Sequence, residues 1–369
     1  MQSIAVWNTA FLGDAVLTLP LLRLLHAAWP EARLDFYVRG GLMELFSAQP
    51  EISNVYAYDK RKTDKGLVGV KKIAGEIFAR RYSIWINAHS SPRSAVLALA
   101  SRAGMRIGYT ESALSSVVLT DRLNRRFGEL HEVDRLLQLA LPLRPPRELW
   151  QDEDLLWPDV TLPFSAEIEA DNFLEVLRPG PVLGIHPGSV WPTKCWLLKG
   201  FAKIARRALE AGANVVLLGG QEDCLKAEQI IGLLGFELAA VQGRLVNLAG
   251  KTSLAVLAAV IARMQCYLTN DSGPMHLAWA QRVPVTAVFG PTVPEFGFAP
   301  RGNSSVINAK EPCSPCGKHG HKVCPKKHFN CMKNVDPDQV WLDVESKLYP
   351  WKKMAAERYE LLRTWRVEE

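Results

Sequence analysis

Two stretches of sequence decide the fold: IAVWNTAFLGD at residues 4–14 and VLGIHPGSVWPTKCW at residues 182–196. Each begins with a short apolar run of strand length, passes through a turn of small and polar residues, and leads into a helical pattern. Outward from each stretch, short apolar runs alternate with helical patterns along that half of the chain. Because such alternation is typical of parallel sheets covered by helices, we predict an α/β protein with two Rossmann-like, doubly wound domains facing across a cleft.

The expected elements follow from hydrophobic period and from Gly and Pro breakers. Strands are predicted at residues 4–8, 34–38, 54–58, 82–87, 105–109, 182–186, 214–218, 266–269 and 283–289. Helices are predicted at residues 14–28, 92–103, 132–141, 166–177, 198–211, 224–234 and 254–264. The Pro- and Trp-rich region 142–163 is expected to be a loop with a short strand. The run Arg-Pro-Gly-Pro at 178–181 predicts domains at 1–178 and 179–345, followed by a terminal helix within 346–369 that packs back on the first domain.

Length and composition set the class of protein. A chain of 369 residues is long enough for two to three domains, and 48% hydrophobic with 22% charged residues excludes disorder, collagen and coiled coil. The net charge of +6 favours an anionic partner, or serves solubility alone. Asp14 interrupts an N-terminal apolar segment that lacks a basic region, so we expect no signal peptide or anchor. Seven cysteines, an odd number, favour a reducing cytoplasm.

Charged and hydroxyl side chains follow the first strand of each half. Asp14 stands where a helix begins and could accept a proton from a substrate hydroxyl, or could merely cap the helix. Lys194, with Ser189 and Thr193 nearby before a helix, suits a diphosphate, although a solvated lysine in an ordinary loop is the alternative. The chain has no GxGxxG, and Leu245 stands where a P-loop ending in Gly-Lys-Thr would need glycine, so these nucleotide motifs are disfavoured.

Two further strand ends add candidates. The turn TNDSGPMH at 269–276 would direct Asp271, Ser272, Gly273 and His276 toward the same edge, while Pro274 in the first helical turn also allows a purely structural account. Glu222 follows another strand and could bind ribose hydroxyls, or could simply favour the helix dipole.

Together these motifs resemble glycosyltransferase family 9, the ADP-heptose:lipopolysaccharide heptosyltransferases, and the heptosyltransferase II type most closely. The resemblance rests on GDAVLTLPLLRLLHAAWPEARLDFYV, INAHSSPRSAVLALASRAGMRIGY, HEVDRLLQLALPL, HPGSVWPTKCW, LLGGQED and TNDSGPMHLAWAQRVPVTAVFGPTVPEFGFAP, in that order along nearly the whole chain.

The resemblance implies a GT-B fold that binds the acceptor in the first domain and the nucleotide sugar mainly in the second. It implies an inverting, metal-independent transfer of heptose from ADP-heptose to a lipopolysaccharide inner-core acceptor. Asp14 matches the catalytic base and Lys194 the lysine that contacts the diphosphate. Matches to the rest of the donor site are Ser189, Thr193, Glu222, Asp271, Ser272, Gly273 and His276.

The sequence departs from the family pattern at two places. Val293 stands in Gly-Pro-Thr-Val-Pro where many members have an acidic residue, and Asn8 and Thr9 replace basic or hydroxyl residues. These departures leave the acceptor open, so another nucleotide sugar or a protein acceptor remains an alternative.

A cysteine cluster lies near the end of the chain. Four thiols at Cys313, Cys316, Cys324 and Cys331 are close enough in sequence for one tetrahedral site, with structural zinc expected and iron second. We expect no metal or other cofactor in catalysis. The cluster also raises two rival hypotheses, a zinc-ribbon nucleic-acid binder and an iron–sulfur oxidoreductase, but no aromatic-rich basic stripe and no dinucleotide fingerprint accompany it. We therefore expect no nucleic-acid partner.

The partners expected from this interpretation are ADP-heptose and a lipid-linked acceptor. Lysines interleave the cysteines of the 313–331 loop and could hold the enzyme against an anionic membrane. The predicted location is the cytoplasm, peripheral at the inner face of the cytoplasmic membrane.

Overall fold

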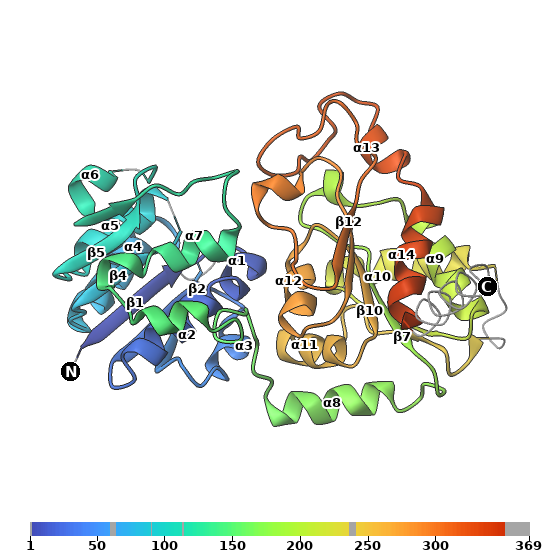
Figure 1. Ribbon diagram of the computed structural model, residues 1–369, viewed down its shortest axis with the longest axis horizontal. Helices are drawn as coiled ribbons and strands as arrows, with labels where there is room; N and C mark the ends of the chain where they lie inside the picture. The colour runs from blue at the N-terminus through green and yellow to red at the C-terminus, as the bar shows by residue number, and fades with distance from the viewer. Residues whose placement is uncertain (1, 60–63, 90, 113, 236–240, 351–369) are drawn as a thin grey trace, which may run out of the picture. The chain divides into compact units, whose positions relative to one another are not determined.

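The structure is a computed structural model that describes residues 2–59, 64–89, 91–112, 114–235 and 241–350 (Figure 1). The chain divides into two compact units. The first unit comprises Met1–Pro163 together with Glu295–Ala299, and the second comprises Phe164–Pro294 and Pro300–Glu369.

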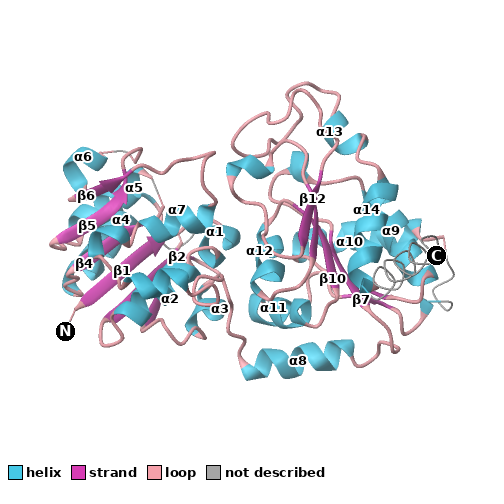
Figure 2. Ribbon diagram, in the orientation of Figure 1, coloured by secondary structure: helices cyan, strands magenta, loops and turns pink. Residues whose placement is uncertain are grey.

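The first unit contains a six-stranded parallel sheet in the order β3-β2-β1-β4-β5-β6 (Figure 2). Its strands are β1 Ser3–Asn8, β2 Arg33–Arg39, β3 Asn54–Tyr58, β4 Ile84–Asn87, β5 Met105–Tyr109 and β6 Asp121–Leu123. Its helices are α1 Leu12–Val16, α2 Leu19–Ala28, α3 Met43–Ser47, α4 Gly66–Ala79, α5 Pro92–Ala100, α6 Ser115–Val118 and α7 Glu132–Gln138.

The second unit contains another six-stranded parallel sheet, in the order β12-β11-β10-β7-β8-β9. Its strands are β7 Val182–His186, β8 Asn214–Leu217, β9 Leu245–Asn247, β10 Cys266–Asn270, β11 Val285–Val288 and β12 Ser304–Ile307. Its helices are α8 Phe164–Leu174, α9 Leu198–Glu210, α10 Cys224–Leu233, α11 Leu254–Ala262, α12 Gly273–Ala280, α13 Asn330–Lys333 and α14 Pro337–Leu348.

Both sheets have the same topology, which confirms the predicted fold class of two doubly wound domains. The order reverses between β1 and β4 in the first unit and between β7 and β10 in the second. Ligands of such sheets bind beyond the carboxyl ends of the strands at this reversal. The loops that follow β1, β7 and β10 are those in which the sequence predicts Asp14, Lys194 and Asp271.

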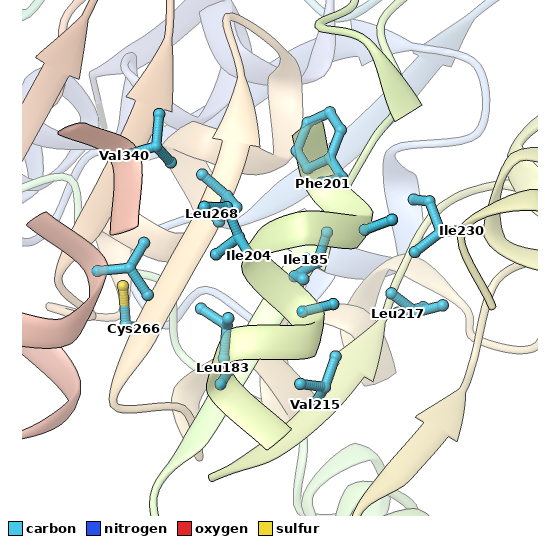
Figure 3. Packing of buried hydrophobic residues seen from close by; sticks show 14 of the residues in the cluster. Leu183, Ile185, Phe201, Ile204, Val215, Leu217, Ile230, Cys266, Leu268 and Val340 are labelled. Atoms are coloured by element: carbon cyan, nitrogen blue, oxygen red, sulfur yellow. The ribbon is translucent and has the colours of Figure 1, made fainter. Parts of the chain in front are cut away.

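Buried apolar side chains hold each sheet to its helices. In the second unit Leu183, Ile185, Val215 and Leu217 point from β7 and β8 toward Ile204 and the rest of α9 (Figure 3). In the first unit the core beside the sheet is aromatic, with the rings of Trp7 on β1 and Trp85 on β4 stacked at 5.8 Å between their centres, and the two indoles are buried. These cores fix the strand ends from which the functional loops start.

Two sequence-based expectations need correction. The helix expected over residues 14–28 is two helices, α1 and α2, because Pro20 has no N–H to donate to the preceding turn. The strand expected within 142–163 is not formed in that described segment, which instead contains short 3-10 helices at Leu141–Leu143 and Arg147–Gln151. Prolines in this region remove the N–H groups that a strand would need.

The observed division falls before α8 rather than after it. Ala166 and Ala170 of α8 are buried, α8 packs against α11, and Arg263 Nε lies 2.7 Å from Asp171 Oδ1. The breakers at 178–181 therefore lie within the second unit and lead into β7. The terminal helix predicted within 346–369 falls mostly on residues 351–369, outside the described residues.

No described helix combines the length and the apolar character that a membrane crossing requires.

Candidate active site

Asp14 lies in the first turn of α1, shortly after β1, and its position is set by local hydrogen bonds. Phe11 N donates to Asp14 Oδ2 at 3.2 Å, so the side chain does cap the helix, as the structural alternative requires. Asn8 Nδ2 donates to the Asp14 carbonyl at 3.1 Å and to Thr18 Oγ1 at 2.8 Å, which ties the strand end to the helix. The turn is therefore rigid, and one carboxylate oxygen is used to orient the side chain.

The surroundings of Asp14 oppose its ionisation. Burial is the largest cause and the negative charge of Glu132 the second, while the Phe11 amide and the Arg125 guanidinium act in the opposite direction. Together they raise the pKa of Asp14 from 3.8 to about 6. A capping carboxylate on a surface helix needs no such environment, whereas a general base gains proton affinity from it.

Glu132, at the start of α7, is the centre of a buried ion cluster in the first unit. Its Oε1 lies 2.8 Å from Arg125 Nη2, and its Oε2 lies 2.6 Å from Arg135 Nε. Glu132 and Arg135 are buried, and the Arg135 carbonyl accepts a hydrogen bond from Tyr109 at 3.0 Å. Each charge of a buried ion pair would be strongly unfavourable without its partner, so the pair keeps its geometry. The cluster therefore presents fixed charges to Asp14.

Five residues from much later in the chain complete this cluster, and we call Glu295–Ala299 the strap. Its carbonyls accept hydrogen bonds from Glu132 N at 2.8 Å and from Arg135 Nη2 at 2.7 Å. A third carbonyl, that of Ala299, lies 2.8 Å from His131 Nε2. Gly297 has φ +83°, and a Cβ there would lie 2.4 Å from the Leu130 carbonyl, so the strap needs glycine at this position.

In the second unit, Asn270 at the end of β10 joins two loops. Its Nδ2 donates to the carbonyls of Pro187 and Gly188, at 2.9 and 3.2 Å, and its Oδ1 accepts from Trp196 N at 2.9 Å. The side chain is fully buried. It therefore holds the loop after β7 against the turn after β10.

Lys194, Asp271 and Thr292 form the polar centre that this arrangement creates. Lys194 Nζ lies 2.5 Å from Asp271 Oδ2, and Thr292 Oγ1 donates to the same oxygen at 2.6 Å. Ser189 Oγ donates to the Asp271 carbonyl at 3.4 Å. The three strand-end loops of this unit thus place one cation and several hydroxyl groups together, which suits a diphosphate.

Ser272 and Gly273 begin α12 beside this centre, with Ser272 as the N-cap and Pro274 in the first turn. Ser272 Oγ lies 3.2 Å from His186 Nδ1, and His186 Nε2 lies 3.5 Å from Asp223 Oδ2. Burial opposes ionisation of Asp223, but hydrogen bonds from His186 and Lys226 outweigh it and lower the pKa of Asp223 to about 2. This carboxylate therefore fixes the histidine behind the α12 N-terminus.

Three predicted donor residues have different surroundings from those expected. The Thr193 hydroxyl donates to the His321 carbonyl at 2.9 Å and accepts from His321 N at 2.7 Å, so it binds the cysteine loop. Glu222 is exposed on the turn after β8. His276 is buried in α12, where its ring lies 6.5 Å from that of Trp279.

The cysteine loop lies directly against the lysine loop. The rings of Trp191 and His319 stack with their centres 6.4 Å apart. A Cβ on Gly320 would lie 2.5 Å from Trp191 Cβ and 2.9 Å from Lys194 Cγ. The cysteine loop can therefore pack against Trp191 and Lys194 only if residue 320 has no side chain.

The four cysteines of this loop are neighbours. Burial raises the pKa of the Cys331 thiol to about 11, and the charges of the other three cysteines add to the effect. Cys313 Sγ lies 3.8 Å from His328 Nε2. Among the residues that the structure describes, however, no three His, Cys, Asp or Glu side chains are arranged to hold a metal ion. The structural metal predicted at these cysteines stays a prediction.

Sequence reasoning missed the residues that support the site: Asn270, Asp223, Thr292, Glu132 and Arg135. All five stand within motifs of the resemblance, but nothing local assigned them a contact. Thr292 contacts Asp271 from the loop after another strand, and the strap that accepts from Glu132 N lies much later in the chain.

Comparisons with known proteins agree with this arrangement. The family model "Glycosyltransferase family 9 (heptosyltransferase)" matches residues 70–328. Lipopolysaccharide heptosyltransferase 2 of Escherichia coli is 27% identical over 309 residues, which cover 80% of this chain and 84% of that protein.

Two solved structures share the fold. The family 9 glycosyltransferase of Veillonella parvula has a TM-score of 0.81 at 23% identity, covering 95% of this chain and 98% of that one. ADP-heptose lipopolysaccharide heptosyltransferase II of E. coli has a TM-score of 0.75 at 23% identity, covering 95% of this chain and all of that one.

Proposed function

This chain belongs to glycosyltransferase family 9, the heptosyltransferases, and from that premise we propose that it transfers heptose from ADP-heptose to a lipopolysaccharide inner-core acceptor. The observation that carries the proposal is the centre formed by Lys194, Asp271 and Thr292 at the N-terminus of α12. It combines a cation with helix amides at the sheet edge where doubly wound folds bind nucleotides.

The reaction first requires that the leaving group be stabilised. As the bond to the anomeric carbon breaks, negative charge develops on the ADP diphosphate, and Lys194 together with the first amides of α12 stabilises it. Asp271 orients the lysine until the diphosphate competes for it. Since the protein supplies this positive charge itself, we propose that the transfer needs no metal ion.

Activation of the acceptor is the second requirement. At neutral pH an Asp14 carboxylate with a pKa of about 6 is ionised and takes the proton of the acceptor hydroxyl as it attacks. Attack from the face opposite ADP inverts the anomeric configuration. In this proposal Asp14 is the catalytic residue, and Glu132 and Arg125 set its charge environment.

The donor is tested by thermal stabilisation with ADP, ADP-heptose, UDP-glucose, GDP-mannose and NADH, because a ligand that binds the native state raises the melting temperature. We expect stabilisation by ADP and ADP-heptose and a loss of about tenfold or more in their affinity in Lys194→Ala, from the lost charge-assisted contact. The matched control is Lys203→Ala, an exposed lysine of α9 that pairs with Asp338. Stabilisation by a different nucleotide sugar would overturn the heptose, and a flat panel would contradict the transferase.

The acceptor and the stereochemistry need a transfer assay. Heptose-deficient lipopolysaccharide is incubated with ADP-heptose, and the anomeric configuration of the product is read by NMR. We expect the inverted anomer, with the same rate in the presence of EDTA. Retention of configuration, or loss of the reaction in EDTA, would contradict the mechanism.

The location follows from the two substrates. A nucleotide sugar is a cytoplasmic metabolite and the acceptor is a lipid, so we propose that the enzyme works in the cytoplasm, peripheral at the inner face of the membrane. Fractionation of cells that express the protein at native level tests this, and recovery in the periplasm would contradict it.

The cysteine loop is proposed to take up one structural zinc or iron ion. The four thiols are near neighbours in a loop that contacts the donor lysine loop, and a bound cation would relieve their mutual repulsion. Elemental analysis of the purified protein tests this, with Cys313→Ser/Cys316→Ser as the variant and Cys224→Ser as the control. Absence of metal from the wild-type protein, purified without chelator, would contradict it.

A further inference from the structure

The outward sides of α4 and α5 in the first unit carry apolar and basic side chains together. We call these residues the α4–α5 face: Leu67, Val68, Lys71, Lys72, Phe78, Arg93, Val96, Leu99 and Arg102. Leu67 and Val68 are 88% and 83% exposed, and Phe78 is half exposed. A surface helix of a soluble protein normally turns polar residues outward, so this face is unusual.

The face follows from the helical period of α4. Gly69, Ile73 and Ile77 form its buried stripe, at intervals of one turn. Val70 and Ala74 pack against the core beside this stripe. Leu67 and Val68 precede the stripe, Phe78 follows it, and all three are exposed. The exposure is therefore built into the register of the helix.

The two helices form one continuous surface. α4 packs against α5, and α5 packs against α6 (Figure 1). The Arg102 guanidinium lies 4.9 Å from the ring centre of Phe78, which joins the ends of α4 and α5. On α6, Val117 is 73% exposed.

The charge of the face is positive. Lys71, Lys72, Arg93 and Arg102 are exposed around the apolar side chains. Glu76 is the acidic residue of α4, and it is only partly exposed and lies 3.8 Å from Arg80. α5 has no acidic residue. An occupant of this face must therefore be anionic and must also accept aliphatic and aromatic side chains.

These two requirements identify the occupant. A second copy of the chain would place like charges opposite one another, and nucleic acid would leave Leu67, Val68 and Leu99 without apolar contact. The headgroup region of an anionic bilayer meets both requirements, because lysines contact phosphates while apolar side chains enter the acyl boundary.

We propose that the α4–α5 face is the surface on which this protein docks to an anionic lipid bilayer. The inference rests on the proposed function, since a lipid-linked acceptor requires the enzyme to work at a membrane. This surface differs from the docking site predicted from the sequence, which is formed by the lysines of the cysteine loop. Beside those lysines the large apolar side chain that is exposed is Val323.

The test is cosedimentation of the full-length protein with vesicles of phosphatidylcholine, with and without phosphatidylglycerol. We expect binding that requires phosphatidylglycerol and a fall of about tenfold or more in the partition coefficient for Lys71→Glu/Lys72→Glu, because each lysine near an anionic surface contributes several-fold. Leu67→Ser/Val68→Ser should weaken binding by a similar factor. These side chains are exposed, so neither variant should change the melting temperature.

Matched controls separate this surface from others. Leu225→Ser/Leu233→Ser changes two exposed apolar residues of α10, and Lys318→Glu/Lys322→Glu reverses charges in the cysteine loop. We expect both to bind vesicles like the wild-type protein. Unchanged binding of the α4–α5 variants would overturn the proposal, as would loss of binding confined to the cysteine-loop variant.

A second readout links docking to the reaction. Transfer to a delipidated, water-soluble core oligosaccharide should be the same in wild type and in the α4–α5 variants, whereas transfer to vesicle-embedded acceptor should fall with binding. Equal losses on both acceptors would overturn the docking role. The vesicle assay contains no sugar donor, so its outcome is independent of the nucleotide panel that tests the proposed function.

Discussion

Replacing Asp14 by Asn should stabilise the protein at neutral pH while it greatly lowers the rate of transfer. The native environment raises the pKa of this carboxyl from 3.8 to about 6. A carboxyl with a raised pKa contributes stability that is fully present below 3.8 and is lost as the pH rises through about 6. Above that pH the folded wild-type protein has an ionised Asp14, which its surroundings disfavour. The Asp14→Asn variant has a neutral amide there and avoids this cost.

The size of the effect follows from the shift. A difference of about two pKa units corresponds to about 3 kcal/mol between the two protonation states. Asp14 is partly exposed, so solvent screening makes this an upper limit, and about 1 to 2 kcal/mol is the expected gain. The amide oxygen of Asn can still accept from Phe11 N, which keeps the helix cap.

The assay is thermal unfolding of both proteins across a pH series, together with turnover. We expect Asp14→Asn to melt at the higher temperature near about pH 7.5, with an advantage that shrinks as the pH falls through the raised pKa. Turnover should fall by about 10² to 10⁴. The control is Glu153→Gln, which removes an exposed acid from the same unit and should give no pH-dependent gain.

Two results would refute this reasoning. If the variant melts at the wild-type temperature or lower at neutral pH, the site does not disfavour the carboxylate. If it is stabilised but keeps most of its turnover, the carboxyl has a raised pKa and yet is not the base.

Three further predictions concern the groups around the two centres. Glu132→Gln should move the acidic limb of the kcat/KM profile to lower pH, and Arg125→Gln should move it to higher pH, each by about half a pH unit or more. The shifts are opposite because the two variants remove opposite charges near the base. Shifts in the same direction, or no shifts, would contradict the electrostatic role. Gly320→Ala should weaken ADP binding, because its Cβ would displace Trp191 or Lys194. Gly317→Ala, whose Cβ would meet no atom closer than 3.4 Å, should bind normally in the same titration. Gly297→Ala should lower the free energy of unfolding, measured by urea denaturation, by about 1 to 3 kcal/mol. The added Cβ would strain the backbone at positive φ and clash with the Leu130 carbonyl. A variant as stable as the wild type would show that the strap is not tightly bound.

Much of the fold was readable because its determinants are local. The strands at 54–58, 105–109 and 182–186 were predicted with their observed bounds, since each is a short apolar run between breakers. The edge strands β6, β9 and β12 were not predicted. They have three or four residues and partly exposed side chains, so neither length nor alternation distinguishes them from loops.

The candidate site divides in the same way. Asp14, Lys194 and Asp271 were found because each follows a recognisable strand, and a parallel sheet collects such positions at one edge. The role of Thr193 was assigned from its neighbours in sequence, but its hydroxyl is used by His321, more than a hundred residues away. No local sequence pattern predicts that contact.

What the sequence by itself determined is the repeated strand–turn–helix order, the family, and the charged residues at the ends of the strands, because period, turn chemistry and residue type are properties of neighbouring residues. Only the tertiary structure decided how those residues behave. The proton affinity of Asp14 depends first on its burial and then on Glu132 and Arg125, and the orientation of Lys194 depends on Asp271. The apolar side chains of α4 became a surface only when the helix turned its glycine and isoleucines inward. Electrostatic fields and exposure act through space, and which groups are near in space is settled by packing.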